Sequence, residues 1–246
     1  MLSAEGLAKS FGESRVVDDV ALTVQAGTIV AVIGPNGAGK TTLLNLLSGF
    51  LRADAGSIGF DGRAITAMPS YRRCRAGLGR TFQQPSFFPA LTPLENVQVP
   101  LLTMARKHRR MLGRARTALV GEAREILAEV GLGEAGDEPA SALSYGDQRR
   151  LEIGIALGTR PRVLLLDEPM AGMSAAERRA LSELMRDLRA GQGLTLVFTE
   201  HDMDVVFSLA DVVHVLHQGR RLASGTPAEI RADPEVRRVY LGQEAA

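Results

Sequence analysis

Three short apolar runs, each followed directly by polar residues, predict buried strands in this chain. The runs cover residues 28–33, 163–166 and 194–198, and each has the length of a buried strand rather than of a helix. Ligands of open α/β sheets bind beyond the carboxyl ends of the strands. The polar residues after each run are therefore candidates for one shared site in an α/β protein.

Shorter patterns surround the first of these runs. The first thirty residues predict short strands separated by turns, and residues 57–60 predict a further strand that enters a turn. Residues 42–48 predict a helix that ends at Gly49. The chain therefore begins with β structure on either side of a strand, loop and helix.

The middle of the chain predicts helices. Thr92 supplies a hydroxyl cap, and Glu95 adds a carboxylate three residues later, which is a helix start. Helical patterns continue well beyond it, and we expect interruptions near Pro100 and Gly113. Because strand signals are scarce here, residues 92–160 are predicted to form a separate helical subdomain.

The residues after the first apolar run match a phosphate-binding loop, Gly-x-x-x-x-Gly-Lys-Thr. Its glycines let successive N–H groups turn inward around an anion, which also meets the positive end of the following helix. Lys40 adds a charge for the β- and γ-phosphates, and the Thr41 hydroxyl is a candidate ligand of Mg²⁺. An ordinary tight connection is the alternative. The candidate nucleotide-binding residues of this loop are Gly34, Pro35, Asn36, Gly37, Ala38, Gly39, Lys40, Thr41 and Thr42.

Acidic residues and a histidine follow the other two runs. Asp167 is placed to hold Mg²⁺ through water, and Glu168 to polarise a water that attacks a γ-phosphate. Burying two neighbouring carboxylates without such a use would be costly. His201 follows the third run; a histidine there is often a cap or a core residue, but in this series we interpret it as a γ-phosphate contact.

Four further candidates also have ordinary structural interpretations. Phe11 lies beside a turn, where it either joins the core or stacks on a purine ring. Gln83 follows an apolar strand, and we expect its amide at the ligand edge of the sheet. Ser144 is a good N-cap, yet its hydroxyl together with the Gly146 N–H at a helix start also forms a second anion site. Two phosphate-binding surfaces, one of them facing outward, indicate that a second copy completes the site.

Composition narrows the class of protein. The 246 residues are 45% hydrophobic and 23% charged, with a formal net charge of +1. These values are typical of a globular protein and disfavour general nucleic-acid binding. The apolar runs are too short to cross a bilayer, no signal peptide is predicted, and the single cysteine, Cys74, forms no internal disulfide. We therefore expect a cytoplasmic protein.

One basic segment stands out from this balance of charge. No acidic residue occurs between residues 96 and 121. The segment is interpreted either as a solvated face or as a surface that lies near anionic lipid or an acidic partner. Its six basic residues are Arg106, Lys107, Arg109, Arg110, Arg114 and Arg116.

In order and spacing, these motifs resemble those of ABC transporter ATP-binding proteins, over nearly the whole chain. The resemblance implies an α/β fold with a RecA-like P-loop ATPase core, an antiparallel β subdomain and an inserted helical subdomain. It implies one ABC ATPase domain over residues 1–246, in which residues 1–91 and 161–246 form the ATP-binding core with its β subdomain and residues 92–160 form the helical subdomain.

The resemblance also assigns roles. Phe11 would stack on adenine, and Gln83 would act in catalysis and metal binding and link the metal site to a permease contact. Ser144 and Gly146 would bind the γ-phosphate of an ATP held by the opposite subunit. Catalysis would then involve Glu168, His201 and Gln83, and the metal would lie on Thr41, Gln83 and Asp167.

The implied cofactors are ATP and Mg²⁺, and the implied partners are other proteins. A second ATP-binding subunit, identical or homologous, would join this one in a head-to-tail dimer. Two transmembrane permease subunits would hold the pair at the inner face of the cell membrane, and an extracytoplasmic solute-binding protein would act indirectly. No nucleic acid is expected.

Finer segments resemble importers of branched-chain amino acids and related solutes; they are residues 79–83, 143–146, 149–153, 227–230, 233–236 and 240–242. Two departures from the commoner family pattern stand beside them. Tyr145 and Asp147 replace residues of Leu-Ser-Gly-Gly-Gln, and we expect Tyr145 not to adopt the backbone angles open to glycine. Ser174 replaces an acidic or amide residue, and we expect it to cap the next helix while removing a charge from the subunit interface.

Three other functions are alternatives to the import of amino acids. The ATPase of a lipid or lipopolysaccharide exporter would suit the basic segment. A soluble ABC ATPase acting on ribosomes or DNA is disfavoured by the presence of one cassette rather than two. A P-loop small-molecule kinase would leave Ser144 and His201 without a role.

Overall fold

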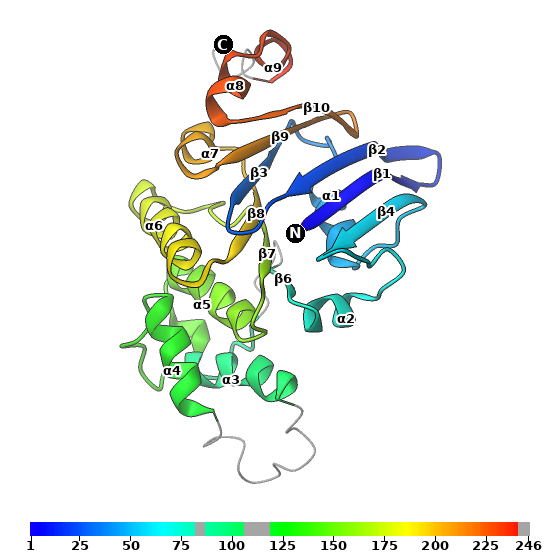
Figure 1. Cartoon of the computed structure of the whole chain (residues 1–246). Coiled ribbons are helices and arrows are strands. Elements are labelled where there is room, and N and C mark those ends of the chain that lie inside the picture. The colour runs from blue at the N-terminus through cyan, green and yellow to red at the C-terminus, as the bar shows by residue number, and fades with distance from the viewer. Residues whose placement is uncertain (82–86, 106–118, 241–246) are drawn as a thin grey trace.

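The structure, a computed structural model, describes residues 1–81, 87–105 and 119–240. These residues form two β-sheets flanked by helices (Figure 1). The larger sheet has the strand order β10-β9-β3-β8-β7-β6. Its strands are β3 (Ile29–Ile33), β6 (Leu78–Arg80), β7 (Val163–Asp167), β8 (Thr195–Thr199), β9 (Val212–His217) and β10 (Arg220–Gly225).

The three predicted apolar runs lie side by side at the centre of this sheet as β3, β8 and β7. Every residue of these three strands is buried, which explains why they are mainly apolar and not alternating. They pair in parallel, whereas β10 runs antiparallel to β9 at the edge. Their carboxyl ends therefore meet at one edge of the sheet.

The smaller sheet is antiparallel and has the order β2-β1-β4-β5. The strands predicted in the first thirty residues and at residues 57–60 contribute to it as β1, β2 and β4. Its buried face shares one apolar cluster with helix α1 and the larger sheet. Its strands are β1 (Leu2–Phe11), β2 (Ser14–Val24), β4 (Ala55–Phe60) and β5 (Arg63–Ala64).

Helices cover the larger sheet and extend below it in the view of Figure 1. Between β6 and β7 the described residues form helices and no strand. The apolar cluster of these helices continues into that of the sheet, and the boundaries at residues 92 and 160 stay a prediction. The helices are α1 (Lys40–Ser48), α2 (Ser70–Arg75), α3 (Pro93–Met104), α4 (Val120–Glu129), α5 (Tyr145–Leu157), α6 (Ala175–Gln192), α7 (Met203–Leu209), α8 (Pro227–Ala232) and α9 (Pro234–Val239), with a 3-10 turn at Ala140–Ala142.

Two predicted helix starts are confirmed by their caps. The Thr92 hydroxyl accepts a hydrogen bond from the Glu95 N–H, and the Glu95 carboxylate accepts one from the Thr92 N–H. Ser174 and Glu177 form the same capping box at the start of α6. Each pair satisfies two backbone N–H groups that the helix itself leaves unpaired.

The interruption predicted at Pro100 is wrong, because α3 continues through this residue. Pro100 is buried against Gly158, and a Cβ on that glycine would come within 2.7 Å of the proline ring. Close packing of α3 on α5 therefore outweighs the backbone hydrogen bond that a proline cannot donate. Gly113 lies outside the described residues.

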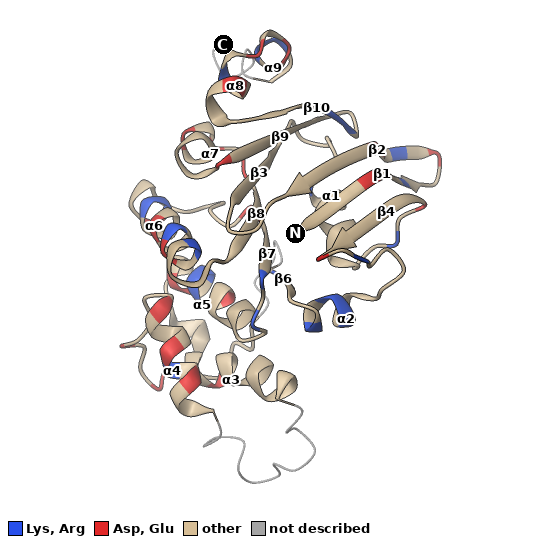
Figure 2. Cartoon of the chain, viewed as in Figure 1, with Lys and Arg blue, Asp and Glu red and all other residues tan. Residues whose placement is uncertain are grey.

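Acidic residues occur along α4, and basic residues occur along α2 (Figure 2). The basic segment from Arg106 to Arg116 lies outside the described residues. Among the helices that the structure does describe, none has both the length and the hydrophobicity to cross a membrane.

Candidate nucleotide-binding site

The predicted phosphate loop joins β3 to α1, as the sequence indicates. Its glycines have positive φ angles, 150° at Gly34, 79° at Gly37 and 99° at Gly39. A Cβ on Gly34 would lie 2.1 Å from the carbonyl oxygen of Leu216, and one on Gly39 would lie 2.6 Å from that of Val16. The backbone angles and the space therefore both require glycine at these two positions.

The turn between β9 and β10 supports this loop from behind. The N–H of Gly219 donates a hydrogen bond to the carbonyl oxygen of Ala38, at 3.2 Å. The N–H of Asp18 donates to the carbonyl oxygen of Gly219, at 2.8 Å. Gly219, in the turn between β9 and β10, thus contacts the phosphate loop and is itself held by Asp18 of β2.

A cavity of about 250 Å³ opens beside the loop, and Val16, residues 36–42 and Glu168 line it. Lys40 is buried here, and its Nζ donates to the carbonyl oxygens of Gly34 at 2.7 Å and Pro35 at 3.2 Å. Burial lowers the pKa of Lys40, and the negative charges of Glu168 and Asp167 partly offset this shift. A small cavity with a buried cation and a helix N-terminus at its wall suits a phosphate group.

Asp167 ends β7 and receives three side chains. The hydroxyls of Thr199 and Thr41 donate to its Oδ1, at 2.9 Å and 3.2 Å, and Arg80 forms an ion pair with its Oδ2 at 3.2 Å. Thr41 and Asp167 present two hard oxygen donors at one point beside the phosphate cavity, and such donors suit Mg²⁺. The two residues therefore fit the metal role predicted for them.

Arg80 was not predicted as a site residue. Its side chain is 6% exposed, and Nη1 also donates to Asn45 Oδ1 at 2.7 Å and Ser48 Oγ at 3.0 Å. Burial lowers the pKa of Arg80, and Asp167 opposes that change through its charge and a hydrogen bond. The arginine thus fixes the Asp167 carboxylate against α1. A charged residue at the end of an otherwise buried short strand was the available signal.

Glu168 and His201 contact each other directly. Glu168 Oε1 lies 2.8 Å from His201 Nε2, and the Glu168 N–H donates to Thr199 Oγ1 at 2.9 Å. The φ angle of Glu168 is 48°, a strained value for a residue with a side chain. The strand ends of β7 and β8 hold this conformation, which points the carboxylate toward the histidine and the phosphate cavity.

Glu200 is a second residue that sequence reasoning missed. It is buried, and its carboxylate accepts hydrogen bonds from the N–H groups of Met170 at 2.8 Å and His201 at 3.2 Å. Burial, the largest influence, raises the pKa of Glu200. Its place after an apolar run resembles that of Asp167, but its carboxylate orients backbone on both sides of the Glu168–His201 pair.

Ser144 and Gly146 lie at the start of α5, away from the phosphate cavity. The Ser144 hydroxyl accepts from the Asp147 N–H at 3.1 Å and donates to the Asp147 carboxylate at 2.8 Å, so its predicted cap is confirmed. Gly146 is buried against Glu177, and neither residue lines the cavity at the phosphate loop. Tyr145, as expected, does not adopt a glycine conformation: it is the first residue of α5 and is not among the residues with a positive φ angle.

Phe11 and Gln83 complete the predicted set. Phe11 ends β1 with 48% of its surface exposed, and Lys9 Nζ lies 5.7 Å from its ring centre. The interpretation of Phe11 as a core residue is therefore wrong, and an accessible ring face suits stacking. Gln83 lies outside the described residues.

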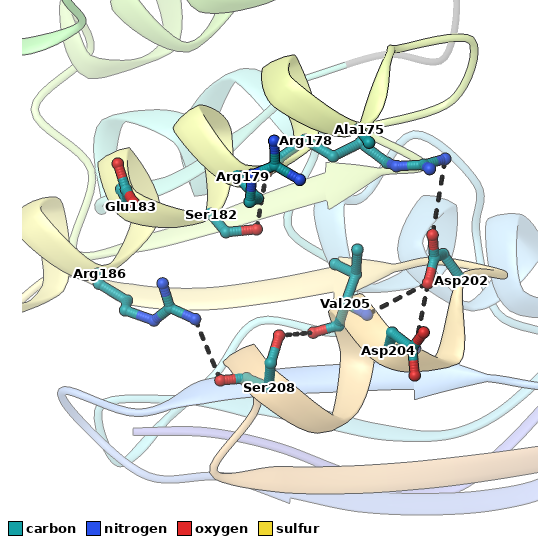
Figure 3. A pocket seen from close by; sticks show the side chains of 10 residues that line it. All are labelled: Ala175, Arg178, Arg179, Ser182, Glu183, Arg186, Asp202, Asp204, Val205 and Ser208. Atoms are coloured by element: carbon teal, nitrogen blue, oxygen red, sulfur yellow. Dashed lines mark hydrogen bonds and ion pairs between the residues drawn. The ribbon is translucent and has the colours of Figure 1, made fainter.

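A larger groove of about 490 Å³ lies between α6 and α7 (Figure 3). Two of its arginines have partners within the groove. Arg178 forms an ion pair with Asp202 at 3.5 Å, and Arg186 donates a hydrogen bond to the backbone carbonyl of Ser208. With three arginines and three acids in its lining, the groove offers no excess charge to a phosphate. The smaller cavity at the loop is the candidate nucleotide site.

Residues 17–171, well over half of the chain, match the family model for the ABC transporter. The chain belongs to the ABC transporter family. Structures of ABC cassettes share its fold, and ATP hydrolysis is the activity of this family. A second model, described as the branched-chain amino acid ATP-binding cassette transporter, matches residues 220–246.

Curated ABC proteins resemble the chain over almost its full length. It is 39% identical to the high-affinity branched-chain amino acid transport ATP-binding protein LivG of Salmonella typhimurium and to BraF of Pseudomonas aeruginosa, covering 99% of this chain and 98% of each relative. It is 37% identical, with the same coverage, to the lipopolysaccharide export system ATP-binding protein LptB of Acidithiobacillus ferridurans.

Solved ABC cassettes share the fold. The ADP conformation of the cassette MJ1267 superposes with a TM-score of 0.87 at 31% identity, covering 98% of both chains. A dimeric cassette, MJ0796 bound to ADP and phosphate, gives a TM-score of 0.80 at 26% identity, covering 92% of this chain and 99% of that one. The predicted α/β P-loop ATPase fold is thereby confirmed.

Proposed function

We propose that this ABC ATPase powers the import of branched-chain or related amino acids through a separate transmembrane permease. The observation that carries the substrate class is the match of residues 220–246 to the branched-chain family model. The names of LivG and BraF, relatives over nearly the whole chain, point the same way.

The geometry supports roles for several residues in the phosphate cavity and beside it. Lys40 and the N–H groups of the loop would hold the β- and γ-phosphates, while Thr41 and Asp167 would hold Mg²⁺, which supplies positive charge beside the phosphates when bound. Glu168 would orient and polarise the attacking water, and His201 would fix the Glu168 carboxylate through their 2.8 Å contact. Phe11 would stack on the adenine.

The remaining phosphate contacts would come from a second cassette. Ser144 lies outside the phosphate cavity of its own chain, at an exposed helix start. A relative of the same fold is a dimer with ADP and phosphate. In a head-to-tail pair, Ser144 and Gly146 of each chain would face the γ-phosphate held by the other.

The proposed assembly is peripheral to the membrane. Two cassettes would bind two permease subunits at the inner face of the cell membrane, with an extracytoplasmic solute-binding protein delivering the solute. The transport role named for the relatives supports this arrangement, and Gln83 would lie between the metal site and the permease.

The catalytic assignment predicts a separation of binding from hydrolysis in Glu168→Gln. The amide keeps the size of the side chain and lacks the carboxylate charge, so turnover should fall by about 100-fold or more while ATP still binds. Steady-state ATPase and fluorescent-nucleotide titration measure the two effects. Glu183→Gln, on the exposed face of α6, is the matched control, and near-normal turnover in Glu168→Gln would remove the base from its role.

The substrate class is tested with the assembled transporter. Tagged chain purified from native membranes should bring its permease with it, and leucine, isoleucine or valine with the solute-binding protein should stimulate the ATPase. The similarity to LptB favours lipopolysaccharide export as the second candidate. Stimulation by lipopolysaccharide and not by amino acids would replace the proposed function with that one.

A further inference from the structure

Tyr145 reaches from the start of α5 to the loop that follows Glu168. Its hydroxyl donates a hydrogen bond to the carbonyl oxygen of Ala171 at 3.0 Å. The same hydroxyl accepts from Arg149, at 2.8 Å from Nη2 and 3.2 Å from Nε. A Cβ on Gly172 would lie 3.5 Å from the tyrosine ring, so ring and loop are in close contact.

Arg149 is itself held in place. It is buried and forms an ion pair with the buried carboxylate of Glu152, at 2.9 Å and one helical turn further along α5. The guanidinium therefore presents its N–H groups to Tyr145 in one orientation. Because a fixed cation accepts no hydrogen bond, the tyrosine proton is directed to the Ala171 carbonyl.

Ala171 connects this contact to the backbone of Glu168. The Ala171 N–H donates to the carbonyl oxygen of Glu168 at 3.2 Å, while its own carbonyl accepts from Tyr145. The strained backbone of Glu168, with φ at 48°, depends on its neighbours to persist. Thr199 of the sheet accepts a hydrogen bond from the Glu168 N–H. On the carbonyl side, Glu168 is held by the two hydrogen bonds that lead through Ala171 to Tyr145.

We propose that Tyr145 is a positioning residue for hydrolysis: its hydroxyl joins the start of α5 to residues 169–174 and so holds the Glu168 carboxylate toward the attacking water. The inference rests on the role of Glu168 in the proposed function. It gives the departure from Leu-Ser-Gly-Gly-Gln a purpose, since a glycine at residue 145 would leave this connection unmade.

Tyr145→Phe tests the proposal because it keeps the ring on Gly172 and removes only the hydroxyl. We expect kcat for ATP to fall about three- to tenfold, with KM for MgATP within about twofold, and Tm to fall slightly because Arg149 loses an acceptor. Tyr71→Phe, at the exposed tyrosine of α2, is the matched control and should leave all three values unchanged. An unchanged kcat in Tyr145→Phe, with or without a lower Tm, would overturn the proposal.

A double variant shows whether Tyr145 acts through Glu168. In the Glu168→Gln background, Tyr145→Phe should produce little further loss, because the carboxylate that it positions is already gone. Losses that multiply independently, or a rise in KM alone, would show that the hydroxyl acts elsewhere and would refute the inference. A wild-type chain without ATPase activity would instead refute the proposed function, and the two failures are thereby distinguished.

Discussion

His214 lies in the core on β9 with 3% of its surface exposed, and neither ring nitrogen has a well-formed hydrogen bond among the described residues. Burial lowers the pKa of His214 from 6.5 to about 4, the charge of Arg221 adds to the shift, and the backbone of Thr23 weakly opposes it. The folded chain therefore favours the neutral imidazole over the protonated one.

Acid should therefore destabilise the protein through this residue. The unfolded chain takes up a proton as the pH falls below 6.5, and the folded chain does so only near pH 4. The stabilisation is thus complete above pH 6.5 and decreases toward pH 4, with about 2 kcal/mol lost between about pH 7 and about pH 5.

Urea unfolding at the two pH values measures this loss. In His214→Leu the part of the pH dependence that belongs to this ring should disappear, whereas His217→Leu, at the end of the same strand, should retain it. Equal acid sensitivity in wild type and His214→Leu would show that other groups carry the effect.

At the residue scale, sequence reasoning located the groups with a recognisable motif after a strand and missed Arg80 and Glu200, which lie at strand ends of the same sheet. Asp167, Glu168 and His201 follow apolar runs, so their meeting at one edge of the sheet could be predicted. Arg80 comes from another strand and contacts Asp167 only after folding. The charge at the end of a buried strand marks Arg80 as unusual, but no local pattern shows that Asp167 is its partner.

At the element scale, α1 is fixed at both ends. The phosphate loop forms its start, and Arg73 of α2 holds its end by donating to the carbonyl oxygens of Leu46 and Leu47, each at 2.7 Å. Arg73 is 2% exposed and also donates to Met68 and Thr66, so four backbone carbonyls surround it. Burial lowers the pKa of this guanidinium to about 10.

Arg73→Met should lower the free energy of unfolding by about 3 kcal/mol, because it leaves buried carbonyls without donors. Denaturant unfolding measures the change. Arg72→Met, on the exposed face of the same short helix, should have little effect. Equal stabilities for the two variants would show that Arg73 does not secure α1.

Elements with clear caps could be predicted well, and the failure at Pro100 has a physical cause. The starts of α3 and α6 depend on side chains three residues apart, which the sequence displays directly. The continuation of α3 depends on Gly158, which lies far along the chain and leaves room for the proline ring. Local propensity carries no information about such a contact.

At the scale of the whole molecule, the proposed head-to-tail dimer predicts complementation between two inactive variants. Lys40→Ala would damage the phosphate loop, and Ser144→Arg would block the contact to the opposite nucleotide. A mixed dimer retains one site with both parts intact, because each site combines the loop of one chain with the Ser144 of the other.

Mixing the purified variants, with unfolding and refolding or co-expression to exchange subunits, should restore ATPase activity above that of either variant alone. A mixture of Lys40→Ala with a second loop variant, Thr41→Ala, is the control and should stay inactive. The same inactivity in the test mixture would contradict a site shared between two copies of this chain.

The contacts between the phosphate loop and the turn after β9 have a consequence for the order in which the site forms during synthesis. The phosphate loop is made early, but Gly219 donates to its Ala38 carbonyl and Leu216 lies against Gly34. The loop therefore lacks these contacts until residues 216–219 have been synthesised. A chain that ends before residue 216 should therefore bind ATP more weakly than the chain that contains this turn.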